Sequence, residues 1–425
     1  MLELSHIRDS TEQVIAGLEK RGIQNAATMI GEVLDLDQKR RETQLEMDQT
    51  RAEAGNVAKR IGQLKKEGKH EEADQAQQNS LSLKEKVKEL TQAFQEYELK
   101  LKDALYLLPN VPHARVPEGS SSAQNIEVFQ HGDMPNLPEN ALPHWELIQK
   151  YDIIDFELGN KVTGAGFPFY KGKGAKLQRA LINFFLDEAA QAGYDEVQPP
   201  LLVNQDSGLG TGQLPDKEGQ MYHATADNFY LIPTAEVPIT NIFRDVILKE
   251  DDFPIKKVGY TPCFRREAGS WGADVRGLNR LHQFDKVEIV QIQHPDKSYN
   301  TLEEMCAHVK SLLEKLELPY RILSLCAGDL GFTSAFTYDF EVYSAAQKKW
   351  LEVSSVSNFQ TFQSNRLGLR YRDAQNKKYL AHTLNGSALA LPRILAALLE
   401  NNQSPEGIHI PQVLQTYTKF DLIHD

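Results

Sequence analysis

The feature that most restricts the possible folds is a long heptad pattern close to the N-terminus. In its second half, apolar and small residues follow one another at alternating spacings of 4 and 3: Leu83, Val87, Leu90, Phe94, Tyr97, Leu101, Ala104 and Leu108. Such a repeat lines one side of a helix and is typical of a coiled-coil seam. No proline occurs from residue 1 to Leu108, and Pro109 and Pro112 then end the pattern, because proline cannot continue a helix.

The first half of this region carries a weaker version of the same frame. Its apolar positions are Val33, Leu36, Met47, Ala54, Val57, Ile61 and Leu64, and the frame is interrupted at Arg40, Thr43 and Thr50. Glu67-Gly68-Lys69-His70 supplies a turn between the halves. We therefore predict an antiparallel helical hairpin over residues 33–108. Helices of about 40 residues would reach almost 60 Å at about 1.5 Å per residue, so we expect the hairpin to project as an arm.

Basic residues gather toward the expected tip of the arm. They are Arg51, Lys59, Arg60, Lys65, Lys66 and Lys69, with only Glu53 and Glu67 to offset them. The whole chain has a net charge of −12, which by itself argues against a nucleic-acid binder, but phosphate contacts depend on local lysine and arginine. A solvated helix face is the alternative to a polyanion site. A partner helix from another protein is possible but not required, because the seam is satisfied internally.

The composition sets outer limits on function. A length of 425 residues suggests two or three domains with a large core. We expect neither a secretory signal nor a membrane span, since the N-terminus lacks a basic segment followed by an apolar run. Cys263, Cys306 and Cys326 show no metal-binding spacing. This cysteine usage favours a cytoplasmic protein without a disulfide framework or a zinc site.

The remainder of the chain suggests a linker followed by one large domain. Residues 109–143 are rich in Pro, Gly, Ser, Asn and His, as expected of a linker. A helical pattern covers Leu177 to Ala192, and five strand-like runs follow: Asn228 to Ile232, Val258 to Phe264, Lys286 to Gln293, Tyr338 to Tyr343 and Trp350 to Ser355. There is no regular strand–helix alternation and no Gly-rich phosphate loop. We predict an α+β fold: residues 1–108 as a helical domain with the arm, and residues 144–425 as an antiparallel sheet flanked by helices.

One charged segment predicts a nucleotide site. Phe264-Arg265-Arg266-Glu267 precedes a polar, Gly-rich loop with Arg276-Gly277-Leu278, and the chain returns through His282 to Glu288. Arginine presents a planar fork of donors that can hold a phosphate and a carboxylate together. On a strand, Glu267 would share a face with Arg265 and could accept from the amine of a base, and Phe284 could stack on that base. The alternative is a surface hairpin with solvated charges.

This segment resembles motif 2 of the class II aminoacyl-tRNA synthetases, and other segments make the resemblance specific to the seryl-tRNA synthetases. Thr234-Ala235-Glu236 is similar to the amino-acid-binding segment of that family, and Glu352-Val353-Ser354-Ser355 to its ATP and magnesium segment. The run from His382 to Arg393 resembles motif 3, and Pro200 matches the motif 1 proline. The resemblance covers essentially the whole chain.

The resemblance implies an ATP- and magnesium-dependent enzyme that forms seryl-adenylate and then charges serine tRNA. The fold would be the class II catalytic domain preceded by a coiled-coil arm that binds the long variable arm of the tRNA. The resemblance also implies a homodimer built through the motif 1 strand, and it allows selenocysteine tRNA as a second substrate.

The resemblance assigns roles to individual residues. Arg265 would bridge the α-phosphate and the serine carboxylate as the catalytic residue. The ATP site would comprise Arg265, Arg266, Glu267, Phe284, Glu352, Val353, Ser354, Ser355 and Arg393, with Phe284 and Arg393 on either side of adenine and Glu352 and Ser355 holding magnesium. On a strand, Arg266 would point to the opposite face from Arg265, so its assignment to the ATP site is the weakest of these. Serine would be held by Thr234, Ala235, Glu236, Arg265, Glu288, Asn385 and Ser387.

Motif 3 departs from the family pattern at two positions. Ala388 and Ala390 replace glycines, and we expect alanine to serve there in a helix.

Two other functions fit parts of the chain. A related ligase that loads an amino acid onto a carrier protein would lack the arm over residues 33–108. A non-catalytic regulatory relative would have lost one or more of Arg265, Glu267, Glu288, Glu352 and Arg393, and all five are present.

Overall fold

The computed structural model describes residues 1–216, 218–267 and 276–424. The chain divides into two compact units. We call Leu2–Glu19 with Ile23–Pro109 the helical unit, and Met1, Lys20–Gly22 and Asn110–Asp425 the sheet unit.

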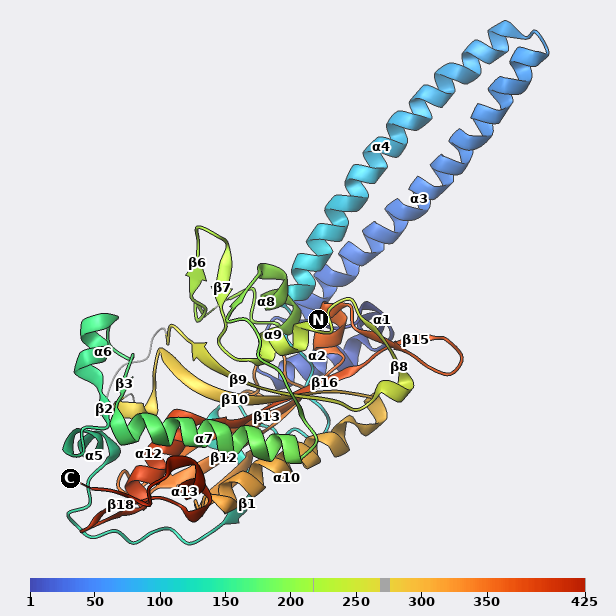
Figure 1. Ribbon diagram of the computed structural model, residues 1–425. Helices are drawn as coiled ribbons and strands as arrows, with labels where there is room; N and C mark the ends of the chain where they lie inside the picture. The colour runs from blue at the N-terminus through green and yellow to red at the C-terminus, as the bar shows by residue number, and fades with distance from the viewer. Residues whose placement is uncertain (217, 268–275, 425) are drawn as a thin grey trace. The chain divides into compact units, whose positions relative to one another are not determined.

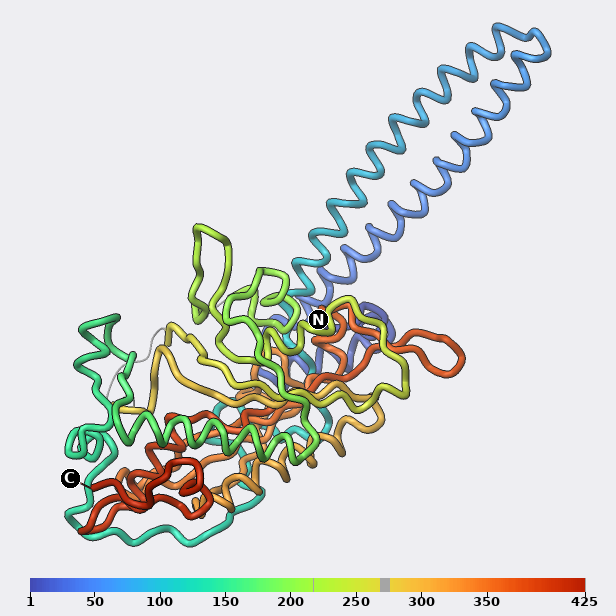
Figure 2. Tube along the Cα trace, in the orientation of Figure 1, coloured from blue at the N-terminus to red at the C-terminus, as the bar shows by residue number. Residues whose placement is uncertain are grey.

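The helical unit contains the expected hairpin. Its helices are α1 (Leu4–Asp9), α2 (Thr11–Lys20), α3 (Ala26–Lys66) and α4 (His70–Leu107). Helices α3 and α4 run side by side in opposite directions (Figures 1 and 2), and the turn between them has Gly68 at φ +73°. Helix α3 has 41 residues, a length of about 60 Å at 1.5 Å per residue. The predicted coiled-coil arm is thus confirmed, although α3 begins seven residues earlier than expected, because Ala26 and Ile30 are also buried.

The polar residues that interrupt the seam form local contacts, although the buried Nε of Arg40 has no hydrogen-bond partner among the described residues. Arg40 donates to the fully buried Asp37 at 3.1 Å and lies over the ring of Phe94. Asp37 is also paired with Arg8 and Arg41. The Thr50 hydroxyl donates to the carbonyl of Glu46 at 2.7 Å. A buried polar group is tolerated when it is hydrogen-bonded, so these residues interrupt the apolar pattern without breaking the helix.

The sheet unit is built on eight strands in the order β1-β11-β12-β13-β16-β10-β9-β4. In that order they are Ile126–His131, Tyr320–Ser324, Phe336–Ser344, Lys349–Gln360, His382–Ala390, Gln283–Gln293, Ile255–Phe264 and Asp195–Glu196. Neighbours are antiparallel except β4 and β9, which are parallel. Each of the five strand-like runs expected from the sequence coincides with all or part of a strand, namely β7, β9, β10, β12 and β13. The α+β prediction is confirmed.

The remaining elements surround this sheet. The helices are α5 (His144–Lys150), α6 (Phe156–Val162), α7 (Gly172–Gln191), α8 (Gln205–Thr211), α9 (Glu236–Asn241), α10 (Ser298–Lys315), α11 (Phe362–Leu367), α12 (Leu391–Asn401) and α13 (Gln412–Thr418), with short 3₁₀ turns η1 (Ser122–Gln124), η2 (Glu250–Asp252), η4 (Gly277–Asn279) and η5 (Pro295–Lys297). The smaller strands are β2 (Ile154–Asp155), β3 (Phe169–Tyr170), β5 (Leu202–Val203), β6 (His223–Ala224), β7 (Phe229–Leu231), β8 (Ile247–Lys249), β14 (Arg370–Arg372), β15 (Lys378–Leu380), β17 (Gln403–Ser404), β18 (Gly407–His409) and β19 (Leu422–Ile423).

Strand β10 shows how the sheet separates core from site. Side chains alternate between the two faces of a strand. Val287 and Ile289 belong to the main apolar core, to which helices α7, α10 and α12 also contribute. Phe284 and Lys286, at the alternate positions, line a cavity. Figure 1 shows α7, α10 and α12 packed along the sheet.

The segment expected to be a linker takes part in the sheet. Residues 126–131 form β1, an edge strand paired with β11. The buried Asn110 donates to the carbonyls of Thr333 and Phe359, each at 2.9 Å. None of the helices in the described part of the chain combines the length and apolar character that crossing a bilayer requires.

Candidate active site

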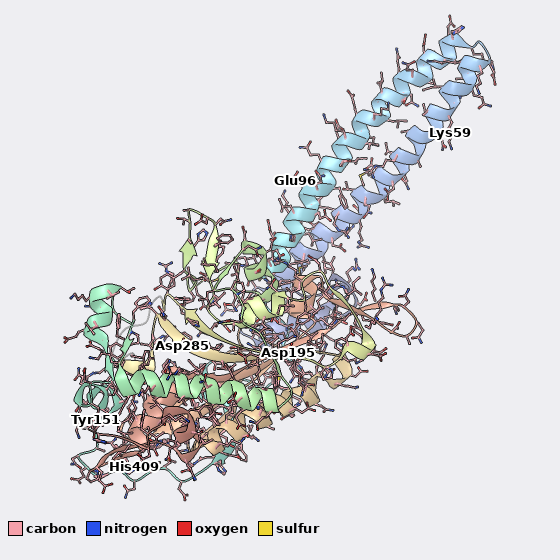
Figure 3. All side chains as sticks on the ribbon, viewed as in Figure 1. Lys59, Glu96, Tyr151, Asp195, Asp285 and His409 are labelled. Atoms are coloured by element: carbon pink, nitrogen blue, oxygen red, sulfur yellow. The ribbon has the colours of Figure 1, made fainter. Side chains whose placement is uncertain are left out.

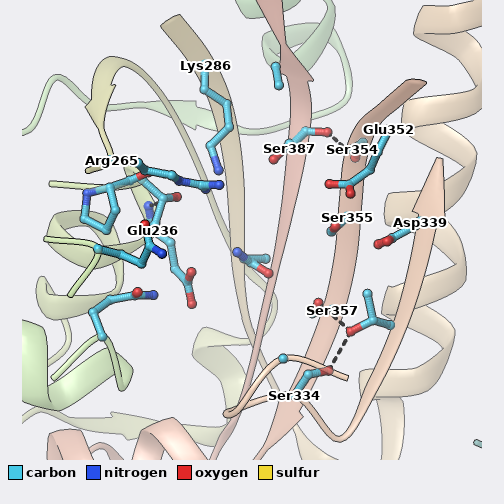
Figure 4. Close-up of a pocket in the computed structure, with 18 of the residues that line it drawn as sticks. Glu236, Arg265, Lys286, Ser334, Asp339, Glu352, Ser354, Ser355, Ser357 and Ser387 are labelled. Carbon is cyan, nitrogen blue, oxygen red and sulfur yellow. Dashed lines mark hydrogen bonds between the residues drawn. The ribbon is translucent and has the colours of Figure 1, made fainter. Parts of the chain in front are cut away.

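A cavity of about 800 Å³ opens over the strands β10, β12, β13 and β16. Its lining includes Thr234, Glu236, Arg265, Glu267, Phe284, Glu352, Val353, Ser354, Ser355, Asn385, Ser387 and Arg393. Figure 4 shows Arg265 and Glu236 on one wall, with Glu352, Ser355 and Asp339 on the opposite wall. The structure therefore brings together most of the residues that were assigned from sequence to serine and ATP.

The motif 2 residues lie at the end of a hairpin. Strand β9 ends at Phe264, which pairs with Gln283 at the start of β10. The Arg265 guanidinium lies 5.2 Å from the centroid of the Phe284 ring, and its Nε donates to the carbonyl of Pro233 at 3.3 Å. Glu267 forms an ion pair with Arg280. The cationic and aromatic groups that a nucleotide needs are thus adjacent.

Our reason for placing Arg265 and Glu267 on one face was wrong. Both residues follow the strand, and Glu267 has a left-handed backbone with φ +49°. Strand alternation therefore does not apply to them, yet both line the cavity. Arg266 is exposed and is not among the lining residues. The polar loop at residues 268–275 lies outside the described residues.

Glu288 is the centre of a buried polar group under the cavity. It is fully buried, and its two carboxylate oxygens accept from Thr234 Oγ1 at 3.2 Å and Asn385 Nδ2 at 2.9 Å. Lys286 forms an ion pair with the same carboxylate. Glu288 is not itself a lining residue, whereas Thr234, Asn385 and Lys286 are. It therefore fixes the residues that face the cavity. Sequence reasoning missed Lys286, although it lies at the same strand alternation as Phe284 and Glu288.

Glu236 is the carboxylate that faces the cavity from the other side. It is 5% exposed and accepts from Gln363 Nε2 at 2.6 Å. Burial, together with the nearby Glu288 carboxylate, raises the pKa of Glu236 to about 7. A buried carboxylate that is costly to ionise gains most from a bound cation. Ala235, assigned to the same segment, is buried and is not among the lining residues.

A second acidic group lies across the cavity on β12 and β13. Glu352 is half exposed, and Asp339 is paired in register with Ser355. Burial, with the neighbouring Glu352 carboxylate, raises the pKa of Asp339 well above its ordinary value. Its Oδ1 atom is buried and has no hydrogen-bond partner among the described residues. Sequence reasoning missed Asp339; the available signal was its place in the predicted strand Tyr338 to Tyr343.

Motif 3 supplies one further cation. Strand β16 runs directly into α12, which carries Arg393 close to its N-terminus. Arg393 Nε donates to the carbonyl of Asn279 at 3.0 Å and Nη1 to that of Glu352 at 2.8 Å. The expectation that Ala388 and Ala390 lie in a helix was wrong, because both belong to β16. Ala388 is fully buried in the main core, where a small side chain is compatible with close packing between strand and helix.

The antiparallel sheet and the motifs gathered in its cavity define a class II aminoacyl-tRNA synthetase. The family model described as the tRNA synthetase class II core domain (G, H, P, S and T) matches residues 221–402, and the one described as the seryl-tRNA synthetase N-terminal domain matches residues 1–112. The chain is 50% identical over 422 residues to the serine–tRNA ligase of Salinibacter ruber, covering 99% of this chain and 98% of the relative. The chain belongs to the seryl-tRNA synthetase family.

Solved structures agree with this assignment. The chain is similar to a crystal structure of the seryl-tRNA synthetase from Pyrococcus horikoshii complexed with ATP, with a TM-score of 0.93, 33% identity, and coverage of 100% of this chain and 99% of that chain. It is also similar to the cytoplasmic serine–tRNA ligase of Naegleria fowleri in complex with AMP, with a TM-score of 0.85, 26% identity, and coverage of 97% and 95%. The predicted family, fold and enzyme class, serine–tRNA ligase, are confirmed.

Proposed function

We propose that this chain activates L-serine with ATP in the cavity described above and then transfers serine to the 3′ end of serine tRNA. The observation that carries the proposal is the opposition of Arg265 and Glu236 on one wall to Glu352 and Ser355 on the other (Figure 4). The two similar structures that hold ATP or AMP support nucleotide binding in this fold. The reaction joins a serine carboxylate oxygen to the α-phosphorus and releases pyrophosphate.

The nucleotide would lie between Arg265 and Arg393. Adenine fits between the ring of Phe284 and the Arg393 guanidinium, because aromatic and guanidinium planes both stack on bases. Glu267 would accept from the adenine amino group. Arg265 would contact the α-phosphate and the serine carboxylate together, which places its charge where negative charge develops. The carboxylate is already the nucleophile, so the step needs positioning and charge more than a general base.

The donors on β12 and β13 fit magnesium. No group of three or more His, Cys, Asp or Glu side chains able to hold a metal ion occurs in the part of the chain that the structure describes. Magnesium usually takes one or two carboxylates and completes its shell with water and substrate phosphates. Glu352 and Ser355 would hold it, and the unpartnered Oδ1 of Asp339 is a third oxygen in the same place. When bound, magnesium would offset phosphate charge.

Serine would lie on the side of Glu236. The Glu236 carboxylate would accept from the substrate ammonium, and Thr234 would orient it under the control of Glu288. Asn385 and Ser387 also line the cavity and would contact the side-chain hydroxyl or its surroundings. A pocket that hydrogen-bonds a hydroxyl rejects analogues that lack it, since its own polar groups are then left unpaired.

The proposal predicts an amino-acid profile. In pyrophosphate exchange with each of the twenty amino acids, we expect serine to be preferred over alanine by about 10⁴-fold. The reason is the loss of hydrogen bonds to the hydroxyl in a site whose polar groups are buried. Threonine keeps the hydroxyl and tests the space available. A faster exchange with any other amino acid would contradict the proposed serine site.

The arm is proposed to bind the long variable arm of serine tRNA. The six basic residues from Arg51 to Lys69 are all exposed. Lys69 pairs with Glu67, but Lys59, Arg60, Lys65 and Lys66 form no ion pair with any described residue. Figure 3 shows Lys59 on the outside of α3. By contrast, Lys39, Lys86 and Lys100 pair with Asp35, Glu46 and Glu96. Unpaired lysines are free to contact phosphates.

This contrast gives a matched test of the arm. Changing Lys59, Lys65 and Lys66 together to glutamine is expected to reduce kcat/KM for tRNA charging by about 10- to 100-fold and to lower the slope of log binding constant against log salt by about 2 to 3. Pyrophosphate exchange should be unchanged. The control changes the paired Lys39, Lys86 and Lys100 to glutamine, which removes the same charge. Equal losses in both triple variants would contradict a specific role for the tip.

Other parts of the proposal concern assembly and location. We propose a homodimer, because edge strand β1 exposes Ile126, Val128 and Phe129, and Leu201 and Leu202 after Pro200 are exposed as well. Large exposed apolar patches usually mark interfaces.

We propose a cytoplasmic location. The three cysteines are free, as in proteins of a reducing compartment such as the cytoplasm. Serylation of selenocysteine tRNA stays a prediction, and neither alternative function receives support from the relatives.

A further inference from the structure

We propose that a buried clamp formed by His144, Ser344, Gln347 and Glu400 positions the ATP-binding Arg393, making His144 a positioning residue for adenylate formation. The inference rests on the role proposed above for Arg393. None of the four clamp residues lines the cavity. His144 comes from α5, Ser344 from the end of β12, Gln347 from the turn that follows, and Glu400 from α12.

The clamp is centred on the Glu400 carboxylate. Glu400 is fully buried, and its Oε1 accepts from the backbone N–H of His144 at 2.9 Å, from His144 Nδ1 at 2.7 Å and from Gln347 Nε2 at 2.9 Å. Ser344 donates to its other oxygen. Burial by itself would raise the pKa of Glu400, but the hydrogen bonds from His144 and Ser344 outweigh it and lower the pKa. Glu400 is therefore a stable anion with its acceptor sites occupied.

Two chains of hydrogen bonds lead from the Glu400 carboxylate to the same turn beside the nucleotide site. His144 Nε2 accepts from the backbone N–H of Leu278 at 2.8 Å. Because an amide N–H can only donate, Nε2 carries the lone pair and the ring proton is on Nδ1, directed at Glu400. Gln347 Oε1 accepts from Asn279 Nδ2 at 2.9 Å. Both routes end on turn η4, whose Leu278 and Asn279 line the cavity.

Turn η4 also holds Arg393. The carbonyl of Asn279 accepts from Arg393 Nε at 3.0 Å. Arg393 and Glu400 lie seven residues apart on α12, about two helical turns, so they share a face of that helix. The N-terminal end of α12 is therefore hydrogen-bonded to η4 directly, through Arg393. The C-terminal end is connected to η4 through Glu400 and His144. The guanidinium of Arg393 is fixed against a turn whose own backbone is fixed.

A glycine makes the close approach possible. Gly277 has φ +65°, and a Cβ there would lie 2.3 Å from His144 Nε2. A side chain at this position would both strain the backbone and displace the imidazole. The clamp therefore explains the glycine in the Arg276-Gly277-Leu278 segment. Gly277 leaves space for the His144 ring, which accepts a hydrogen bond from the backbone N–H of Leu278.

Two substitutions separate the two hydrogen bonds of His144. In His144→Gln, the side-chain oxygen can reach the Nε2 position and keep an acceptor for Leu278. In His144→Asn, the amide reaches only the Nδ1 position, so the bond to Glu400 is kept and the buried N–H of Leu278 is left unpaired. We expect His144→Asn to raise the KM for ATP in pyrophosphate exchange by about tenfold, with the KM for serine unchanged, and His144→Gln to have a smaller effect. The control is His308→Asn, at a partly buried histidine on α10 away from the cavity, which should leave both constants unchanged.

A double-mutant cycle shows whether the effect passes through Arg393. In an Arg393→Ala background, whose own KM for ATP is raised, His144→Asn should add less than about a twofold change. The same tenfold factor in both backgrounds would overturn the inference. So would a fall in kcat with an unchanged KM for ATP, which indicates only a loss of folded enzyme. If the asparagine variant does not fold, Gln347→Met, which removes the bond to Asn279, is expected to raise the KM for ATP in the same way, and an unchanged value would overturn the inference.

The same cycle separates this inference from the proposed function. If Arg393→Ala leaves the KM for ATP unchanged, the assignment of Arg393 to the nucleotide is wrong, and the inference falls with it. If Arg393→Ala raises that KM and neither His144→Asn nor Gln347→Met does, the proposed function stands and the clamp has no positioning role.

Discussion

Replacing Arg265 by alanine is expected to slow serine-dependent pyrophosphate exchange by about 10³-fold, the order seen when a group that stabilises developing charge is removed from an active site. Arg265 is the cation of the serine-side wall that lies next to Phe284. It is proposed to contact both reacting partners, so its loss weakens their alignment as well as the charge balance. Arg265→Lys keeps the charge but not the planar fork, so we expect a loss of about 10²-fold.

The neighbouring arginine is the matched control for this prediction. Arg266 is exposed and does not belong to the cavity lining, so Arg266→Ala should keep exchange within about fivefold of the unmodified enzyme. Exchange and thermal unfolding are measured on the same preparations. Equal losses in Arg265→Ala and Arg266→Ala, with both proteins folded, would contradict the proposed role of Arg265.

Replacing Glu236 by glutamine is expected to reduce kcat/KM for serine by about 10²- to 10³-fold, the effect of leaving a charge without its partner in a buried site. Glutamine retains the shape and an oxygen that can accept from Gln363. The variant therefore removes the negative charge with little repacking. The KM for ATP should change far less, and an equal rise in both constants would contradict the assignment of Glu236 to the serine ammonium.

The raised pKa of Glu236, about 7, adds a pH dependence to this prediction. In the empty enzyme the carboxylate is protonated below that pH, so the KM for serine should rise as the pH falls through about 7. The Glu236→Gln variant should not show this rise.

The stability of the folded enzyme should fall as the pH rises, whereas serine binding should improve. The folded-state pKa of about 7 exceeds the ordinary value of 4.5, so the folded enzyme binds the proton more tightly than the unfolded chain does. Stability is therefore lost as the pH rises from about 4.5 to about 7, and the loss is complete above that pH. Glutamine should therefore raise the Tm by a few degrees at pH 8 and by less at pH 5. A Tm difference that is larger at pH 5 than at pH 8 would show that the sign is wrong.

The sequence predicted the elements that depend on long or repeated patterns. The heptad frame located both helices of the arm, because a seam of about seven to nine helical turns contains many positions that independently agree with the pattern. It did not predict the start of α3 at Ala26 or the burial of Asp37, since Asp37 depends on arginines from other turns and another helix. Strand β1 was missed for a related reason. All its residues are exposed, and its alternation between apolar and polar residues covers only Ile126-Glu127-Val128 before Phe129 interrupts it.

In the active site, the motifs predicted which residues lie close together but not which of them face the cavity and which support others from below. Glu288 was expected to contact serine, yet it lies beneath the cavity and binds Thr234 and Asn385. Depth below a surface depends on the packing of β10 against β16, which no local pattern records. Asp339 and His144 were missed because Asp339 acts with residues across a strand pair and His144 with a partner far along the chain. Lys286 pairs with Glu288 on its own strand, but its exposure to the cavity depends on the fold. Their types and positions were visible, but their contacts exist only in the folded chain.

The most direct test of the whole account is a crystal structure of the enzyme with a non-hydrolysable analogue of seryl-adenylate. We predict that the serine ammonium lies against Glu236 and Thr234, that Arg265 contacts the group replacing the phosphate, and that adenine lies between Phe284 and Arg393. Glu267 should accept from the adenine amino group. An analogue bound in the reverse direction, with adenine at Glu236, or bound outside this cavity, would contradict the account.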